Sequence, residues 1–299
     1  MCAALVVAVT GAVSCGDSEN ESGNRSVETV PQYTRIVSTA PNITETLYAL
    51  GLGDRVVGVT SFCRYPPEAR TKPNIGGFLD TNYEALATLE PDLVLCLPEH
   101  ETIRNYLDEL DIPYEIVGNR TVTEILETIT TIGKLCGAGQ AADSLIGDIR
   151  GRIDAVQRNV PDGNRLRILL SIGRSLGGES LEEVYAAGRN TFYDELITIA
   201  GGENAIADSD AAYPLLTAES LLYLDPDIIV DLVPDLETSG LTAADVRAQW
   251  KTVPRLSPAH NERVYVISAD YTVIPGPRFI LLLEDLARIL DSDSASHQH

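Results

Sequence analysis

The sequence predicts an α/β protein made of two similar lobes joined by one long helix. Strand-like apolar runs alternate with helical patterns along the 299-residue chain, which indicates mainly parallel sheets covered by helices. Residues 84–95, EALATLEPDLVL, recur without a gap as residues 219–230, ESLLYLDPDIIV, so the two halves share one construction. Between them, residues 139–160 repeat their apolar side chains at a helical period. A stiff helical connection of this kind permits only a small closing motion.

In the first half, apolar β-type runs predict strands at 35–39, 55–60, 92–97 and 114–118. Asn42 and Glu45 have the spacing of a capping box, and Gly51 can end the helix that they begin. Further helices are expected near 81–89, 101–110 and 122–135. In the second half, the same patterns predict strands at 166–173, 227–232 and 263–268, and helices at 191–202, 217–223 and 277–290.

Both ends of the chain differ from this α/β body. Residues 3–13 form an apolar stretch of signal-peptide length, and AVSC ending at Cys15 fits a lipoprotein box, so we expect residues 1–15 to be a lipoprotein signal with Cys15 lipidated. The alternative is an ordinary secretory signal with a chance cysteine. The polar residues 16–32 predict a flexible tether, and 291–299 a disordered tail. The N-terminal lobe would then cover 33–138 and the C-terminal lobe 161–290.

Charge excludes several classes of partner. The chain has 44 Asp and Glu against 22 Lys and Arg, a net charge of −22, which disfavours binding to nucleic acid or to anionic lipid headgroups. Contact with a membrane is therefore expected only through the lipid anchor. Beyond the leader the cysteines are Cys63, Cys96 and Cys136, an odd number without metal-type spacing. At least one is a free or intermolecular thiol, and Cys96 and Cys136 read as buried apolar residues.

Two segments resemble motifs of enzymes, but their sequence or the elements around them do not match those motifs. GGES at 177–180 is not a nucleophile elbow, and GAGQAA at 137–142 follows a helix where a dinucleotide-binding loop would follow a strand. We therefore expect no catalytic residues and no cofactor.

Three segments of the first half resemble a known family. They are 35–60 (RIVSTAPNITETLYALGLGDRVVGVT), 62–69 (FCRYPPEA) and 74–95 (NIGGFLDTNYEALATLEPDLVL). They are similar to the class III periplasmic substrate-binding proteins of ABC importers, which bind vitamin B12, ferric siderophores or haem. The resemblance extends from about Tyr33 to Leu290 and implies two Rossmann-like lobes with a ligand between them. Within the family, the pattern is most similar to the vitamin B12-binding members.

The resemblance implies a set of residues that line the cleft. Aromatic side chains at Tyr65, Phe78, Tyr213 and Tyr271 would provide flat walls for cobalamin or another metal-containing chelate. Any single one of them could instead belong to a core. Arg174 stands after a predicted strand and is a candidate for gripping a carboxylate or phosphate; Arg278 is another, unless it braces the last helix. The expected ligand-binding set is Pro41, Tyr65, Gly77, Phe78, Arg174, Tyr213, Asp270 and Tyr271.

The repeated glutamates have a different implied role. By resemblance, Glu84 and Glu219 dock the two lobes onto a permease dimer that carries ATPase subunits. The alternative is that they are ordinary acids at helix N-termini, where the helix dipole favours a carboxylate. A monomer at the periplasmic or extracellular face, anchored by lipid, is the expected state.

Other ligands and roles stay open. His100 follows a predicted strand and could be an axial ligand to a haem or cobalt atom, although a surface histidine is the simpler interpretation. No histidine cluster predicts a bare metal ion as ligand. A ferric-siderophore or haem receptor of the same fold is the alternative function, and a sensor or surface-binding protein without transport is the alternative of another class.

Overall fold

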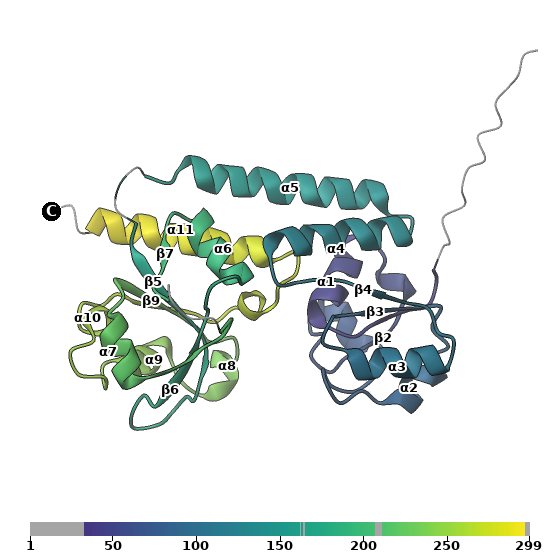
Figure 1. Cartoon of the computed structure of the whole chain (residues 1–299), viewed down its shortest axis with the longest axis horizontal. Helices are drawn as coiled ribbons and strands as arrows, with labels where there is room; N and C mark the ends of the chain where they lie inside the picture. The colour runs from purple at the N-terminus through teal and green to yellow at the C-terminus, as the bar shows by residue number, and fades with distance from the viewer. Residues whose placement is uncertain (1–32, 162, 164, 207–210, 297–299) are drawn as a thin grey trace, which may run out of the picture.

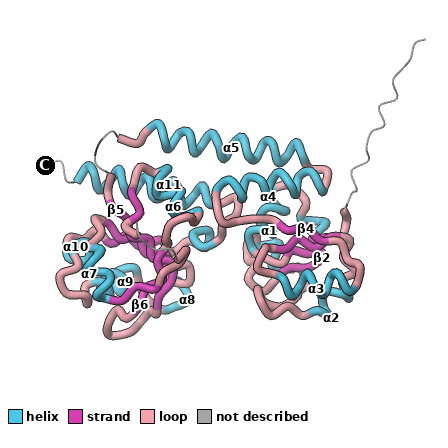
Figure 2. Tube along the Cα trace, in the orientation of Figure 1, coloured by secondary structure: helices cyan, strands magenta, loops and turns pink. Residues whose placement is uncertain are grey.

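The computed structural model describes residues 33–161, 163, 165–206 and 211–296 and contains two α/β lobes beneath a layer of long helices (Figure 1). The predicted signal 1–15, with Cys15, and the predicted tether 16–32 lie outside the described residues. In Figure 2 the strands form two separate groups, and helices are the regular elements that pass between them. The fold class expected from the sequence is therefore confirmed.

The N-terminal lobe contains a four-stranded parallel sheet in the order β2-β1-β3-β4. Every residue of β1 and β3 is buried, as expected for parallel strands covered on both faces. The elements of this lobe are β1 (Ile36–Ser38), α1 (Pro41–Ala49), η1 (Gly53–Arg55), β2 (Val56–Val59), η2 (Pro67–Thr71), α2 (Tyr83–Thr88), β3 (Leu93–Cys96), α3 (Glu101–Glu109) and β4 (Tyr114–Ile116).

The C-terminal lobe contains a mixed sheet in the order β10-β9-β5-β6-β8, with β7 also paired to β5. Strands β9 and β10 continue the parallel pattern, whereas β6 runs antiparallel to both β5 and β8. The elements are β5 (Arg167–Arg174), β6 (Glu183–Ala186), α6 (Phe192–Ile199), β7 (Glu203–Asn204), β8 (Leu215–Thr217), α7 (Ala218–Leu224), β9 (Ile228–Leu232), α8 (Leu236–Ser239), α9 (Ala243–Trp250), α10 (Ser257–His260) and β10 (Val264–Ile267), followed by η3 (Asp270–Val273).

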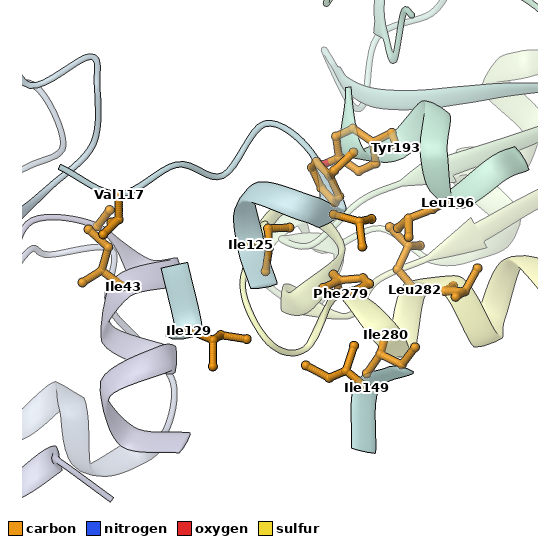
Figure 3. Close-up of a cluster of buried hydrophobic side chains, with 14 of the residues drawn as sticks. Ile43, Val117, Ile125, Ile129, Ile149, Tyr193, Leu196, Phe279, Ile280 and Leu282 are labelled. Carbon is orange, nitrogen blue, oxygen red and sulfur yellow. The ribbon is translucent and has the colours of Figure 1, made fainter. Parts of the chain in front are cut away.

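Three helices connect the lobes: α4 (Val122–Leu135), α5 (Gly139–Arg158) and α11 (Phe279–Ser296). Their apolar side chains meet where the lobes join, with Ile129 of α4 and Ile149 of α5 near Phe279 and Ile280 of α11 (Figure 3). One hydrophobic cluster runs without interruption from Ile36 in β1 through these helices to the strands of the second lobe. The connection is therefore a packed core and not a single exposed helix.

Two sequence expectations were wrong at helix ends. Asn42 and Glu45 do not form a capping box, because α1 begins at Pro41 after Ala40 and has no side-chain cap. The predicted disordered tail is also incorrect for residues 291–296, since α11 continues to Ser296. Asp293 is buried there and accepts hydrogen bonds from Arg263 and Tyr265, which hold the end of the helix against β10. Residues 297–299 lie outside the described part.

Within the described residues, no helix combines the length and the apolar character that crossing a bilayer requires. The cysteines Cys63, Cys96 and Cys136 are all free and buried, which agrees with the expectation for Cys96 and Cys136.

Because one core serves both lobes, we expect the protein to unfold in a single cooperative transition. Replacing the fully buried Phe279 with Ala should lower the free energy of unfolding by about 3 to 5 kcal/mol and keep one transition. Urea curves followed by the fluorescence of Trp250, the single tryptophan, and by far-UV circular dichroism should coincide, because Trp250 reports on the second lobe and dichroism on both. Leu79→Ala, at a side chain 76% exposed, is the control and should change stability by less than about 0.5 kcal/mol. Separate midpoints for the two signals would contradict a shared core.

Candidate ligand-binding cleft

A cleft of about 480 Å³ lies between the lobes and is lined by both. Its N-terminal wall consists of residues that follow the carboxyl ends of β1 to β4, and its C-terminal wall of residues that follow β9 and β10. Open α/β sheets bind ligands at this edge. The lining residues are Pro41, Asn42, Phe62, Arg64, Phe78, Leu97 and Asn119 from the first lobe and Pro234, Asp235, Asp270, Val273, Ile274 and Pro275 from the second.

The lining is largely apolar, with polar groups at a few points. Phe62 is 52% exposed, so most of its ring is available to a ligand. Phe78 is half-buried, and its ring meets the His100 ring edge-on at 4.7 Å between centroids. Two exposed or half-exposed phenyl rings beside prolines suit a large flat molecule, and Asn42, Asn119 and the acids can bind a polar rim.

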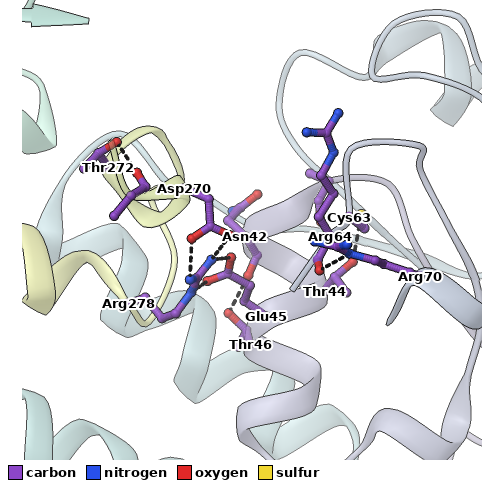
Figure 4. Close-up of polar contacts among 12 residues, drawn as sticks. Asn42, Thr44, Glu45, Thr46, Cys63, Arg64, Arg70, Asp270, Thr272 and Arg278 are labelled. Carbon is purple, nitrogen blue, oxygen red and sulfur yellow. Dashed lines mark hydrogen bonds and ion pairs between the residues drawn. The ribbon is translucent and has the colours of Figure 1, made fainter. Parts of the chain in front are cut away.

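An ion-pair network joins the lobes beside the cleft (Figure 4). The Arg278 Nε donates to Glu45 Oε2 of α1 at 2.9 Å, and its Nη1 donates to Asp270 Oδ1 at 2.8 Å. The guanidinium also lies 3.7 Å from the centre of the Tyr65 ring. Burial raises the pKa of Glu45, and the hydrogen bond from Arg278 opposes that shift. The same guanidinium lowers the pKa of Asp270. Arg278 therefore braces one lobe against the other and has its donors occupied.

Three predicted residues lie in the lining, and others lie close to it. Pro41, Phe78 and Asp270 line the cleft. Gly77 is buried behind Phe78, where a Cβ atom would come within 2.0 Å of Asp80 Oδ1, so it shapes the turn that presents the ring. Tyr65, 42% exposed, stacks on Arg278.

Tyr213 and Tyr271 are outside the lining as well. Tyr213 is 46% exposed. Burial raises its pKa, and the positive charge of Arg120 opposes that shift. Tyr271 packs against the core and donates its hydroxyl to Asp285, and burial raises its pKa to about 12.

The prediction that Arg174 binds the ligand is wrong. Its side chain is 1% exposed and its Nε donates to Asp231 Oδ2 at 2.9 Å. Its Nη1 donates to Gln249 at 2.7 Å, and the guanidinium lies 5.5 Å from the centre of the Trp250 ring. Trp250 also donates to Asp231. Arg174 is therefore part of the interior of the second lobe and has no face toward a ligand.

His100 is neither at the surface nor open to a ligand. It is 2% exposed and lies beneath Phe78. Its Nδ1 accepts from the Leu97 N–H at 3.2 Å and lies 2.8 Å from Thr39 Oγ1, while its Nε2 is buried without a hydrogen-bond partner among the described residues. Burial lowers the pKa of this imidazole, so it is held neutral beneath the cleft.

Glu84 and Glu219 occupy equivalent places in the two lobes. Each is the second residue of its helix, in α2 after the cap Asn82 and in α7 after the cap Thr217, and both are exposed. Neither forms an ion pair with another described residue. These carboxylates are accessible to a partner, and their contact with a permease stays a prediction.

Sequence reasoning missed part of the lining. Arg64 reaches toward the opposite lobe, where its Nη1 lies 3.8 Å from Asp235 Oδ1, and both side chains are more than half exposed. Phe62, Asn119 and Asp235 were also missed. The available signal was positional: Asn119 follows β4 and Asp235 follows β9, at the same carboxyl edge as the residues that were identified.

With this geometry in view, comparison with known proteins shows the family. Residues 36–271 match the model of the family described as periplasmic binding protein, so the chain belongs to that family. It is 28% identical to an uncharacterised ABC transporter substrate-binding lipoprotein, YvrC, of Bacillus subtilis, over 92% of this chain and 85% of that one. It is 30% identical to a cobalamin-binding protein of Halobacterium salinarum, over 92% and 73% of the two chains. Among solved structures, the haem-binding protein RhuT of Roseiflexus sp. RS-1 is similar at a TM-score of 0.72 and 27% identity, over 86% and 98% of the chains.

We expect Arg174 to affect stability and not ligand binding. Arg174→Met leaves Asp231 buried without its cation and should cost about 3 to 5 kcal/mol in urea unfolding. Arg247→Met, at an exposed arginine of α9, should cost less than about 0.5 kcal/mol. A stable Arg174→Met protein would contradict the structural role.

His100 should make stability depend on pH. Because burial lowers its pKa from the ordinary 6.5, the unfolded chain takes up a proton below pH 6.5 that the folded protein does not. The free energy of unfolding should therefore fall, by up to about 1.4 kcal/mol per pH unit, as the pH drops from 6.5 toward the lowered pKa. His100→Gln should remove this loss and the exposed His260→Gln should retain it, as measured by urea unfolding at pH 7.5, 6.5 and 5.5. Equal pH dependence in all three proteins would show that His100 is not the responsible group.

Proposed function

We propose that this chain is the substrate-binding component of an ABC importer and that it carries cobalamin or a related corrinoid to a membrane permease. The observation that carries the proposal is the cleft between two α/β lobes, with phenyl rings and prolines in its walls and amides and acids among them. A corrin has a broad flat face and a rim of amide groups, which match these two kinds of surface. The likeness to the cobalamin-binding protein of Halobacterium salinarum supports the same ligand class.

Release of the ligand would follow docking onto the permease. Glu84 and Glu219 are exposed on equivalent helices, one per lobe, which suits contact with two permease subunits at once.

We further propose that Cys15 carries the lipid that holds the protein at the outer face of the membrane. The AVSC motif supports this, as does the similarity to a substrate-binding protein named as a lipoprotein.

A second candidate ligand is an anionic chelate, either haem or a ferric siderophore. The observation that favours it is Arg64, whose exposed guanidinium in the cleft can pair with a carboxylate. The similarity to RhuT supports haem in the same way that the Halobacterium protein supports cobalamin. Titration of the full chain with cyanocobalamin, haemin and a ferric hydroxamate in parallel separates these ligands.

Phe78 should contribute to binding through its half-exposed ring. Phe78→Ala should weaken the affinity for cyanocobalamin by about 5- to 150-fold, which corresponds to about 1 to 3 kcal/mol. Tyr223→Ala removes an aromatic ring that is 89% exposed on α7, outside the cleft, and is the matched control. Calorimetric titration measures both. Unchanged affinity in Phe78→Ala would remove this ring from the binding site, and failure of the wild type to bind cyanocobalamin would reject the corrinoid.

Charge reversal should separate docking from binding. Glu84→Arg with Glu219→Arg should abolish uptake by the reconstituted transporter while the affinity for the ligand stays within about twofold, because both acids lie outside the cleft. Glu109→Arg with Glu203→Arg makes the same change in net charge at two other exposed acids and should leave uptake intact. A large loss of affinity in the first variant, or equal uptake by both, would contradict the docking role.

A further inference from the structure

A second pocket lies in the N-terminal lobe, on the other side of the loop that carries Arg64. It has a volume of about 290 Å³. Arg64 lines both this pocket and the cleft, so the two are neighbours that share one side chain. The polar side chains of the pocket are those of Thr60, Ser61, Arg64, Arg70, Lys72 and Asn74.

The charge of this pocket is opposite to that of the molecule. Three cationic residues line it and no carboxylate does, although the chain has twice as many acidic as basic residues. Arg70 and Lys72 form no ion pair with a described residue, and the nearest carboxylate to Arg64 is that of Asp235, at 3.8 Å across the cleft. Cations that lack a carboxylate partner and lie together in one pocket attract an anion.

The pocket also keeps hydrogen-bond donors available. The Arg70 Nε donates to the Arg64 carbonyl oxygen at 2.9 Å, which fixes the side chain (Figure 4). Neither terminal nitrogen of Arg70 has a partner among the described residues. Asn74 Oδ1 accepts from the Gly76 N–H at 2.8 Å, and the amide nitrogen of Asn74 donates to no other described residue. Ser61 and Lys72 add a hydroxyl and an ammonium group. Such a set matches the several acceptor oxygens of a phosphate group.

Local backbone structure holds these groups in place. Val59 at the end of β2 forms a β-bridge with Asn74, so the two ends of the loop 60–73 are held together. Between them, the turn η2 carries Arg70, and Lys72 follows directly as its C-terminal cap. Ala69 is fully buried beneath the pocket and anchors the turn. The donors therefore belong to one fixed loop and need little reorganisation to bind an anion.

We propose that this basic pocket is a binding site for a phosphate group or a similar small oxoanion. The anion has two possible sources. It is either a free ion of the medium or a phosphate group of the ligand in the adjacent cleft, reached past Arg64. The second source rests on the function proposed above, whereas the first does not.

The test compares two variants of equal charge. Arg70→Gln with Lys72→Gln removes both unpaired cations from the pocket, and Arg247→Gln with Lys251→Gln removes an exposed arginine and lysine from α9 and its cap in the other lobe. Each protein, as the full chain, is titrated by calorimetry with inorganic phosphate, with cyanocobalamin, which contains a phosphodiester, and with cobinamide, which lacks it. Circular dichroism confirms that each variant is folded.

Two results support the site and one overturns it. If the free ion is the ligand, phosphate binds the wild type and the α9 control alike and binds the pocket variant at least about tenfold more weakly, as expected for the loss of two charge-assisted contacts. If the ligand supplies the phosphate, the pocket variant loses about tenfold or more in affinity for cyanocobalamin and none for cobinamide. Equal behaviour of the pocket variant and the control with all three probes overturns the proposal. Failure of cyanocobalamin to bind the wild type would reject the corrinoid as the ligand, while the phosphate titration would still decide the site.

Discussion

The packed core between the long helices and the two lobes is the constraint on which the cleft depends. Ile149 of α5 and Phe279 of α11 belong to the same buried cluster as the strands of both sheets, so neither lobe can turn far without opening apolar contacts. The Arg278 ion pairs with Glu45 and Asp270 add a polar brace at the inner end of the cleft. If the two walls keep a nearly fixed distance, as the expected small closing motion requires, the cleft is formed before a ligand binds. Binding then costs little conformational entropy.

Three arginines near the cleft illustrate how burial decides the role of a side chain. Arg174 is enclosed by Asp231, Gln249 and Trp250. Arg278 is shared between the lobes and donates four hydrogen bonds to two carboxylates. Arg64 is more than half exposed and has only a distant contact with Asp235. A charge that already has close partners gains little from a ligand, whereas Arg64 can form a new bidentate contact without breaking an old one.

The sequence predicted the fold more fully than the site, for physical reasons. The recurrence of 84–95 as 219–230 and the apolar period of 139–160 reflect side chains of the core, where the apolar pattern determines the structure. The elements β1, β3, β5 and α5 lie close to where these patterns predict them. Pro41, Phe78 and Asp270 were expected from the resemblance to the family, and all three line the cleft. The ligand-binding role predicted for Arg174 was wrong because a position at the end of a strand does not reveal which residues the side chain contacts in the folded protein. The strands β6 and β8 were missed since they are short, antiparallel and half exposed, with an alternating burial that a search for buried runs overlooks.

The net charge of the protein and the charges inside a pocket act over different distances. An acidic protein can therefore still bind an anionic group in a basic pocket. At physiological ionic strength the field of the −22 surface is screened over about 8 Å, so an approaching anion is repelled only near the surface. Inside the basic pocket, the charged groups nearest to a bound anion are Arg64, Arg70 and Lys72, and direct contact with them is much shorter than this screening length. The acidic exterior in turn leaves Glu84 and Glu219 exposed for a cationic partner. The exposed acids and the basic residues lie on different elements: Glu84 and Glu219 on the helices α2 and α7, and Arg64, Arg70 and Lys72 in the segment after β2. The proposed docking and the proposed anion binding therefore would not compete for one surface.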